Sequence, residues 1–110
     1  MATRRAIRLR PQAATQVGFV GTEAKFTARL HDFSPFGLSV KSSREVATGA
    51  VFRLGIQVGA DYFRAAAIVR ANIPGGFAAE FISMTAIDRE MMRRLYLRLQ
   101  MAARDKAPSS

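Results

Sequence analysis

Two groups of residues have the types and spacing that suit recognition of an anionic nucleotide. The first is a run of arginines near the N-terminus that contains Arg4, Arg5 and Arg8. A guanidinium can donate two parallel hydrogen bonds to a phosphate or to the N7 and O6 edge of a guanine, and it can stack on the face of the base. The run can therefore supply both charge and base contacts.

The second group is Asp32-x-Ser34-x-x-Gly37. A fixed carboxylate such as that of Asp32 can accept hydrogen bonds from the N1–H and N2–H₂ groups of guanine, a donor pair that adenine lacks, and a serine hydroxyl can donate or accept nearby. Gly37 allows a positive φ in the turn or a close approach of a ligand to the backbone. Alone, neither group is specific, because arginine-rich termini are often solvated arms and such turns often cap their own backbone.

The composition limits the classes of function. Seventeen Lys and Arg residues against eight Asp and Glu give a formal net charge of +9, so we expect an anionic partner. There is no cysteine and a single histidine, His31, which removes thiol nucleophiles, disulfides and the usual zinc ligands. We find no nucleophile or paired-carboxylate set either, so neither an enzyme nor a metal or cofactor is expected.

The sequence carries no segment that would direct it to a membrane. No apolar run approaches the roughly 18 residues that a membrane span needs. No apolar core follows the N-terminal arginines, as it would in a signal peptide. We therefore expect a cytoplasmic protein without membrane contact.

Short alternating runs make up most of the chain. They predict strands at 15–20, 25–31, 38–41, 51–58, 62–71 and 77–82, separated by turns that include 32–37. This pattern is typical of a small antiparallel barrel or sandwich. From Thr85 the apolar period becomes helical, Thr85-x-x-Asp88 forms a capping-box pattern, and the expected core-facing residues are Ile87, Met91, Leu95 and Leu99.

The order Arg4-x-x-x-Arg8, Asp32-x-Ser34-x-x-Gly37, hairpins and final helix resembles the PilZ domain family over residues 4–100. The resemblance implies a mainly β fold: an antiparallel β-barrel of about six strands with a C-terminal α-helix and a flexible N-terminal arm. We expect the arm at 1–12, the barrel domain at 13–104 with its helix at 85–103, and a tail at 105–110.

The resemblance also implies cyclic di-GMP as the ligand. It places the ligand contacts at Arg4 and Arg8 of the first motif and at Asp32, Ser34 and Gly37 of the second. Arg5 is a further ligand residue, through phosphate or packing, and Arg10 takes a ligand role if the register of the arm shifts. Thr3 directly precedes the first motif, at a position that in the family influences whether one or two stacked dinucleotides bind. The number of bound dinucleotides stays open.

Three functions remain open. The leading hypothesis is a receptor that orders its arm over the barrel on binding cyclic di-GMP and signals to an unidentified effector protein; Ile7 and Leu9 are expected to bury too little surface to hold the arm alone. The second is a basic barrel that binds single-stranded nucleic acid. Such a protein needs exposed aromatic side chains for stacking, but most phenylalanines here fall at core-facing positions. The third is a PilZ-like protein-interaction module that binds no ligand. The intact motifs argue against it.

Overall fold

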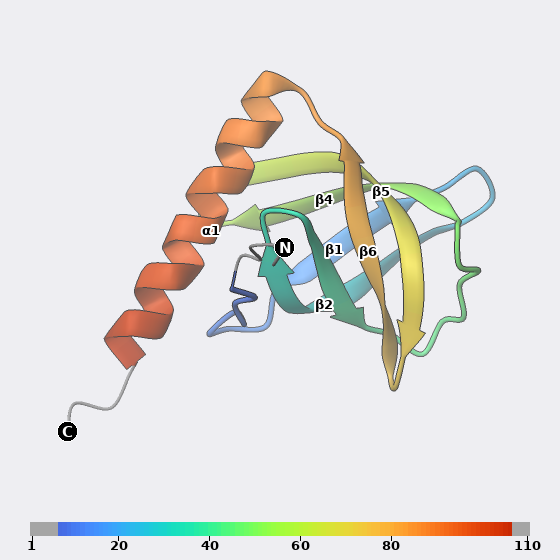
Figure 1. Cartoon of the computed structure of the whole chain (residues 1–110), viewed down its shortest axis with the longest axis horizontal. Coiled ribbons are helices and arrows are strands. Elements are labelled where there is room, and N and C mark those ends of the chain that lie inside the picture. The colour runs from blue at the N-terminus through green and yellow to red at the C-terminus, as the bar shows by residue number, and fades with distance from the viewer. Residues whose placement is uncertain (1–6, 107–110) are drawn as a thin grey trace, which may run out of the picture.

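The structure, a computed structural model, describes residues 7–106. The elements are β1 (Gln16–Val20), β2 (Lys25–Ser34), β3 (Gly37–Lys41), β4 (Val51–Val58), β5 (Asp61–Ile73), β6 (Gly76–Ser83) and α1 (Ala86–Lys106). The strands are all antiparallel and close into a barrel in the order β1-β2-β3-β6-β5-β4, with α1 along one side (Figure 1). This confirms the predicted mainly β fold, a six-stranded barrel with a C-terminal helix.

The connection between β2 and β3 is shorter than the sequence indicates. Asp32 pairs with Ser39, Phe33 with Leu38 and Ser34 with Gly37, so the turn consists of residues 35–36 alone. The predicted turn at 32–37 is therefore too long, because residues 32–34 belong to β2 and Gly37 begins β3. Its polar and turn-forming residues belong to a tight hairpin, and the strand register shifts once, between Leu30 and Asp32.

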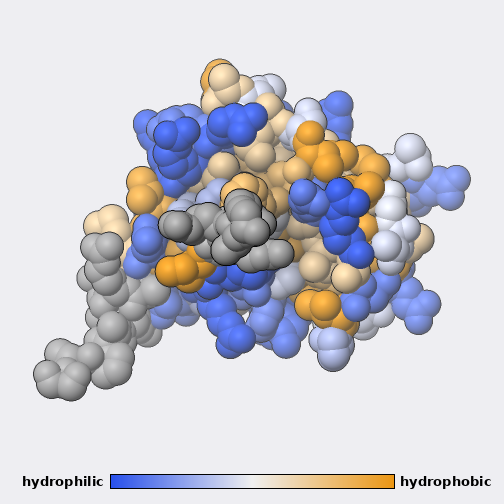
Figure 2. Space-filling view, in the orientation of Figure 1, coloured by the Kyte–Doolittle hydropathy of each residue, from blue (hydrophilic) through white to orange (hydrophobic). Residues whose placement is uncertain are grey.

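Alternation along the strands fills the barrel with aliphatic and aromatic side chains. Phe19, Phe33, Phe63 and Phe77 are almost completely buried, and their rings meet one another or neighbouring phenylalanines, mostly edge to face. The prediction that most phenylalanines face the core is confirmed. Hydrophilic side chains cover much of the face shown in Figure 2, with apolar patches between them.

The C-terminal helix packs on β5 through a face that differs in part from the predicted one. Met92, Leu95 and Leu99 are buried, but Ile87 is 72% exposed, so its prediction as a core residue is wrong. At the start of the helix Asp88 takes the buried side, with 8% of its surface exposed, and because successive helical residues point in different directions Ile87 faces solvent. Thr85 Oγ1 accepts a hydrogen bond from the Asp88 N–H at 3.0 Å and donates one to Asp88 Oδ2 at 2.8 Å, which forms the predicted cap.

Residues 7–106 contain no helix with the length and apolar character needed to cross a membrane.

Candidate ligand-binding site

The chain before β1 is fixed to the barrel by a backbone bridge. Leu9 donates to the carbonyl oxygen of Phe33 and accepts from the Phe33 N–H, both at 2.9 Å, and the Leu9 side chain joins the core with 9% of its surface exposed. From α1, the hydroxyl of Tyr96 donates to the carbonyl oxygen of Ile7 at 2.7 Å. The expectation that Leu9 buries too little surface to hold this segment is therefore wrong.

The reason lies in the edge of β2. β1 pairs with β2 only as far as Arg29, and the final residues of the longer strand β2 extend beyond it. The edge of β2 near Phe33 is thus available to a further extended segment, which Leu9 provides. This pairing joins segments far apart in the sequence, so local patterns do not predict it.

Arg8 and Asp32 lie on the outer side of this pairing. Side chains alternate along an extended segment, so Arg8 points away from the core that Leu9 enters. The Arg8 Nε donates to Asp32 Oδ1 at 3.0 Å, and Nη2 lies 2.9 Å from the same oxygen. The Arg8 side chain is 45% exposed and that of Asp32 19%. The two predicted motifs therefore meet at one ion pair.

A third residue, Ser39, completes this cluster. It is 4% exposed, stands opposite Asp32 in the β2–β3 register, and donates from Oγ to Asp32 Oδ1 at 2.7 Å. Sequence analysis missed Ser39, because the register that brings it to Asp32 depends on the length of the turn. The only available signal was a serine between two core residues, Leu38 and Val40.

These contacts determine the charge of Asp32. Burial alone would raise the pKa of Asp32, but the hydrogen bonds from Arg8 and Ser39 and the positive charge of Arg8 lower it below the ordinary aspartate value. Asp32 is therefore an anion at neutral pH. A carboxylate has roughly four lone-pair sites, so Asp32 keeps acceptor capacity beyond its two protein partners.

Ser34 lies inside the hairpin turn. It is 2% exposed, and its hydroxyl accepts from the Phe36 N–H at 3.2 Å and donates to the Gly37 carbonyl oxygen at 3.4 Å. Its hydroxyl is thus used to close the turn that follows Asp32. Ser34 lies two residues after Asp32 in the sequence, but its hydroxyl is not directed toward Arg8 or Asp32.

Gly37 is required by the packing of β3 on β6. A Cβ at this position would collide with the carbonyl oxygen of Ala79 and would lie 3.1 Å from the Glu80 Cα. Of the two alternatives expected for Gly37, the positive φ is wrong, since the positive-φ glycines of the described chain are Gly49, Gly59 and Gly75. Gly37 permits two backbones to approach closely, and both belong to the barrel.

More cations lie around the ion pair. Arg10 is exposed and flanks Leu9 on the same side as Arg8, and Arg29 and Lys41 stand opposite each other in the β2–β3 register, also exposed. We call Arg8, Arg10, Arg29 and Lys41 the basic strip. Arg4 and Arg5 lie outside the described residues. Among the side chains of residues 7–102 no three His, Cys, Asp or Glu gather to hold a metal ion.

The fold is similar to that of solved PilZ domains. The PilZ domain of YcgR from Escherichia coli, solved with c-di-GMP, has a TM-score of 0.76 at 16% identity, covering 96% of this chain and 98% of that one. A structure of E. coli YcgR in complex with c-di-GMP has a TM-score of 0.77 at 19% identity, covering 94% of this chain and 49% of that one. MrkH of K. pneumonia in its apo state has a TM-score of 0.78 at 14% identity, covering 96% and 56%.

At these identities the structural likeness shows the fold. The chain spans nearly all of the isolated YcgR domain and about half of the YcgR and MrkH chains. No curated protein sequence matches the chain. The family model for the PilZ domain matches residues 2–98, which include both motifs that meet at Arg8 and Asp32. The chain therefore belongs to the PilZ domain family.

Proposed function

We propose that this protein is a cyclic di-GMP receptor without catalytic activity, which binds the dinucleotide over the outer face of β2 and β3. The observation that carries the proposal is the contact between Arg8 and Asp32. It joins the arginine motif to the Asp-x-Ser turn on one surface. The solved YcgR structures with c-di-GMP support the same ligand class for this fold.

The chemistry of the cluster suits a guanine base. Asp32 is ionised and already fixed by two donors, so it can accept from the N1–H and N2–H₂ groups without first being ordered. Arg8 has five N–H donors and is partly exposed, so it can also contact a phosphate or the other guanine edge. The rest of the basic strip offsets the two phosphate charges.

The N-terminal residues supply the moving part of the proposed mechanism. Arg4 and Arg5 precede the anchored Leu9, so ligand-driven ordering of the chain is confined to residues before Ile7. Closing these arginines over the dinucleotide changes the surface offered to an effector protein. The bridge of Leu9 to Phe33 fixes where the described chain meets the edge of β2.

The described aromatic residues argue for this receptor over a binder of single-stranded nucleic acid. Such binders stack bases on exposed aromatic side chains. Among the described phenylalanines only Phe36 is largely exposed, at 60%, and Tyr62 is 48% exposed on another strand. They do not form an aromatic row along the basic strip.

Calorimetric titration of the full chain with cyclic di-GMP, cyclic di-AMP and single-stranded DNA tests the proposal. We expect cyclic di-GMP to bind at least about tenfold more tightly than cyclic di-AMP, because adenine leaves buried polar groups unpaired at roughly 1–3 kcal/mol each. Asp32→Ala should lower affinity and this discrimination.

Asp61→Ala is a matched control. Its side chain is also 19% exposed, and it pairs with Arg98 at 2.6 Å on another part of the surface. We expect this variant to keep full affinity. Equal affinities for the two dinucleotides, or equal losses in the two variants, would contradict the receptor function.

A further inference from the structure

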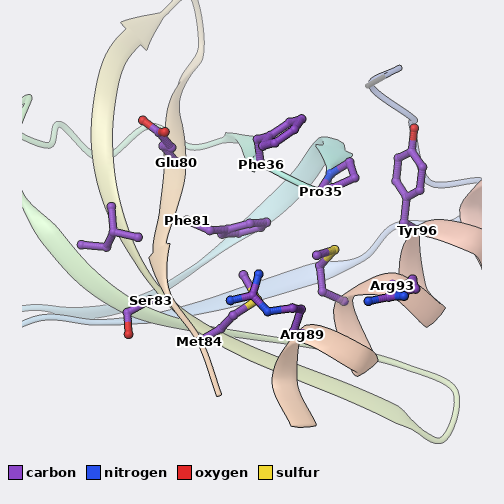
Figure 3. A pocket seen from close by; sticks show the side chains of 11 residues that line it. Pro35, Phe36, Glu80, Phe81, Ser83, Met84, Arg89, Arg93 and Tyr96 are labelled. Carbon is purple, nitrogen blue, oxygen red and sulfur yellow. The ribbon is translucent and has the colours of Figure 1, made fainter. Parts of the chain in front are cut away.

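A groove of about 530 Å³ separates the β2–β3 turn and β6 from α1. Figure 3 shows its two walls facing each other. Pro35 and Phe36 of the turn and Phe81 and Ile82 of β6 form one wall, and the helix forms the other. The groove is separate from the proposed ligand site, because Arg8, Asp32 and Ser39 do not line it.

The wall formed by the turn and β6 is apolar and firmly supported. Phe36 is 60% exposed and Ile82 49%, so both present large apolar side chains to solvent. Phe81 also lines this wall, and its ring centroid is 5.8 Å from that of the core residue Phe33. An apolar surface with a rigid backing and a polar rim is typical of a protein-binding site.

The helix wall is basic. Arg89 and Arg93 lie one helical turn apart and line the groove from the helix (Figure 3). Arg93 reaches Glu90 only at 4.0 Å with both side chains more than half exposed, which is a weak contact, and Arg89 has no ion-pair partner among the side chains of residues 7–102. Glu80, the one acid among the described lining residues, is already paired with Arg70 at 2.6 Å.

We propose that this groove binds an extended acidic segment of a partner protein. Alternate side chains of an extended segment point to opposite sides, about 7 Å apart along each side. One set can place carboxylates on Arg89 and Arg93, whose Cβ atoms are separated by about 5–6 Å, as expected for helix positions i and i+4. The other set can place aliphatic or aromatic side chains against Phe36 and Ile82. Charge complementarity selects an acidic partner.

Both walls are connected to the proposed ligand site. On the helix, Tyr96 donates to the Ile7 carbonyl, and Ile7 directly precedes Arg8. At the turn, the Phe36 N–H donates to Ser34, two residues after Asp32. This coupling rests on the proposed function, because the helix and the turn that line the groove contact the segments that carry Arg8 and Asp32, the proposed dinucleotide contacts.

A defined synthetic peptide tests the groove. The probe alternates glutamate with leucine and phenylalanine and carries a fluorescent label, and the full-length protein is titrated with and without saturating cyclic di-GMP. Fluorescence anisotropy gives the affinity and NMR shift changes locate the site. We expect the shifts to concentrate at Phe36, Ile82, Arg89 and Arg93, and affinity to disappear when the glutamates are replaced by glutamine.

Matched variants separate the groove from the general charge. Arg89→Glu should weaken peptide binding by about tenfold or more, as for a lost charge-assisted contact replaced by repulsion. Arg94→Glu makes the same charge change on the same helix but outside the groove, and should leave affinity within about twofold. Phe36→Ser should weaken binding, whereas Ile87→Ser, at an exposed residue outside the groove, should not.

Several results would overturn the docking site. One such result is NMR shift changes located away from the groove. Another is an equal loss of peptide affinity in Arg89→Glu and Arg94→Glu. A third is a single-stranded oligonucleotide that binds at the groove residues while the peptide does not bind. Calorimetry with cyclic di-GMP on the same samples keeps the two proposals distinct. Peptide binding without dinucleotide binding refutes only the receptor function, and dinucleotide binding without peptide binding at the groove refutes only the docking site.

Discussion

Arg8 and Asp32, 24 positions apart in the sequence, are joined through one oxygen atom: Arg8 Nε and Nη2 lie 3.0 and 2.9 Å from Asp32 Oδ1. The backbone bridge between Leu9 and Phe33 holds the two residues at this distance. The bridge and the ion pair are thus separate contributions to one site. Substitutions can remove the ion pair, or weaken the anchoring of the bridge by removing the buried Leu9 side chain.

Leu9→Ala should loosen the segment that carries Arg8. Truncation of a buried leucine costs about 2–5 kcal/mol, and we expect the lower end because Leu9 lies at the rim of the core. Dinucleotide affinity should also fall, since Arg8 loses its anchor. Urea denaturation and calorimetry measure the two effects, with Ile7→Ala as the control because Ile7 is 67% exposed. A stable Leu9→Ala protein with full affinity would show that burial of the Leu9 side chain has no role in the site.

Arg8→Ala should weaken cyclic di-GMP binding by about tenfold to a hundredfold, as expected for loss of charge-assisted hydrogen bonds worth roughly 1.5–3 kcal/mol. The binding should also become less sensitive to salt, because one screened charge contact is gone. Titrations at several salt concentrations measure both effects. Arg98→Ala serves as the control, since Arg98 is 50% exposed and also paired with an aspartate, Asp61. The same loss in both variants would argue against a specific role for Arg8.

The lowered pKa of Asp32 predicts a pH dependence of stability. A carboxyl with a lower pKa in the folded state stabilises the fold above the unfolded-state pKa of about 3.9, and this contribution is lost as the pH falls through the folded-state pKa. Asp32→Asn should therefore be less stable than wild type at neutral pH, and the difference should shrink in acid. Denaturation curves from neutral to acidic pH measure it. A difference that stays constant with pH would contradict the ion-pair origin of the shift.

Gly37→Ala should destabilise the barrel by about 1–3 kcal/mol, the usual cost of forcing an added methyl group into a packed site. The new Cβ would meet the Ala79 carbonyl, and backbone atoms of a closed barrel cannot move aside easily. Gly18→Ala is the control because the nearest atom to its Cβ would be the Gly55 oxygen at 4.0 Å. Thermal unfolding followed by circular dichroism compares them. Equal stability of the two variants would mean that β3 and β6 separate without cost.

The sequence by itself determined the elements of this protein. Alternating runs identified all six strands, and the change to a helical period after Thr85 identified α1, because both periods follow from local backbone geometry. The order of the two motifs identified the family, which the family model confirms. Of the site, it predicted Arg8 and Asp32 as contacts of one ligand, which stays a prediction, and it did not predict that they contact each other.

Only the tertiary structure decided how these elements meet. Three contacts each join different segments of the chain: the pairing of Leu9 with Phe33, the approach of Ser39 to Asp32 and the collision that excludes a side chain at Gly37. Such contacts depend on strand register and barrel closure, which a single change in turn length shifts by whole residues. The turn at 35–36 set that register, and the local sequence around it was compatible with a longer loop. The ion pair of Arg8 and Asp32 likewise depends on the pairing of Leu9 with Phe33, which joins segments far apart in the sequence.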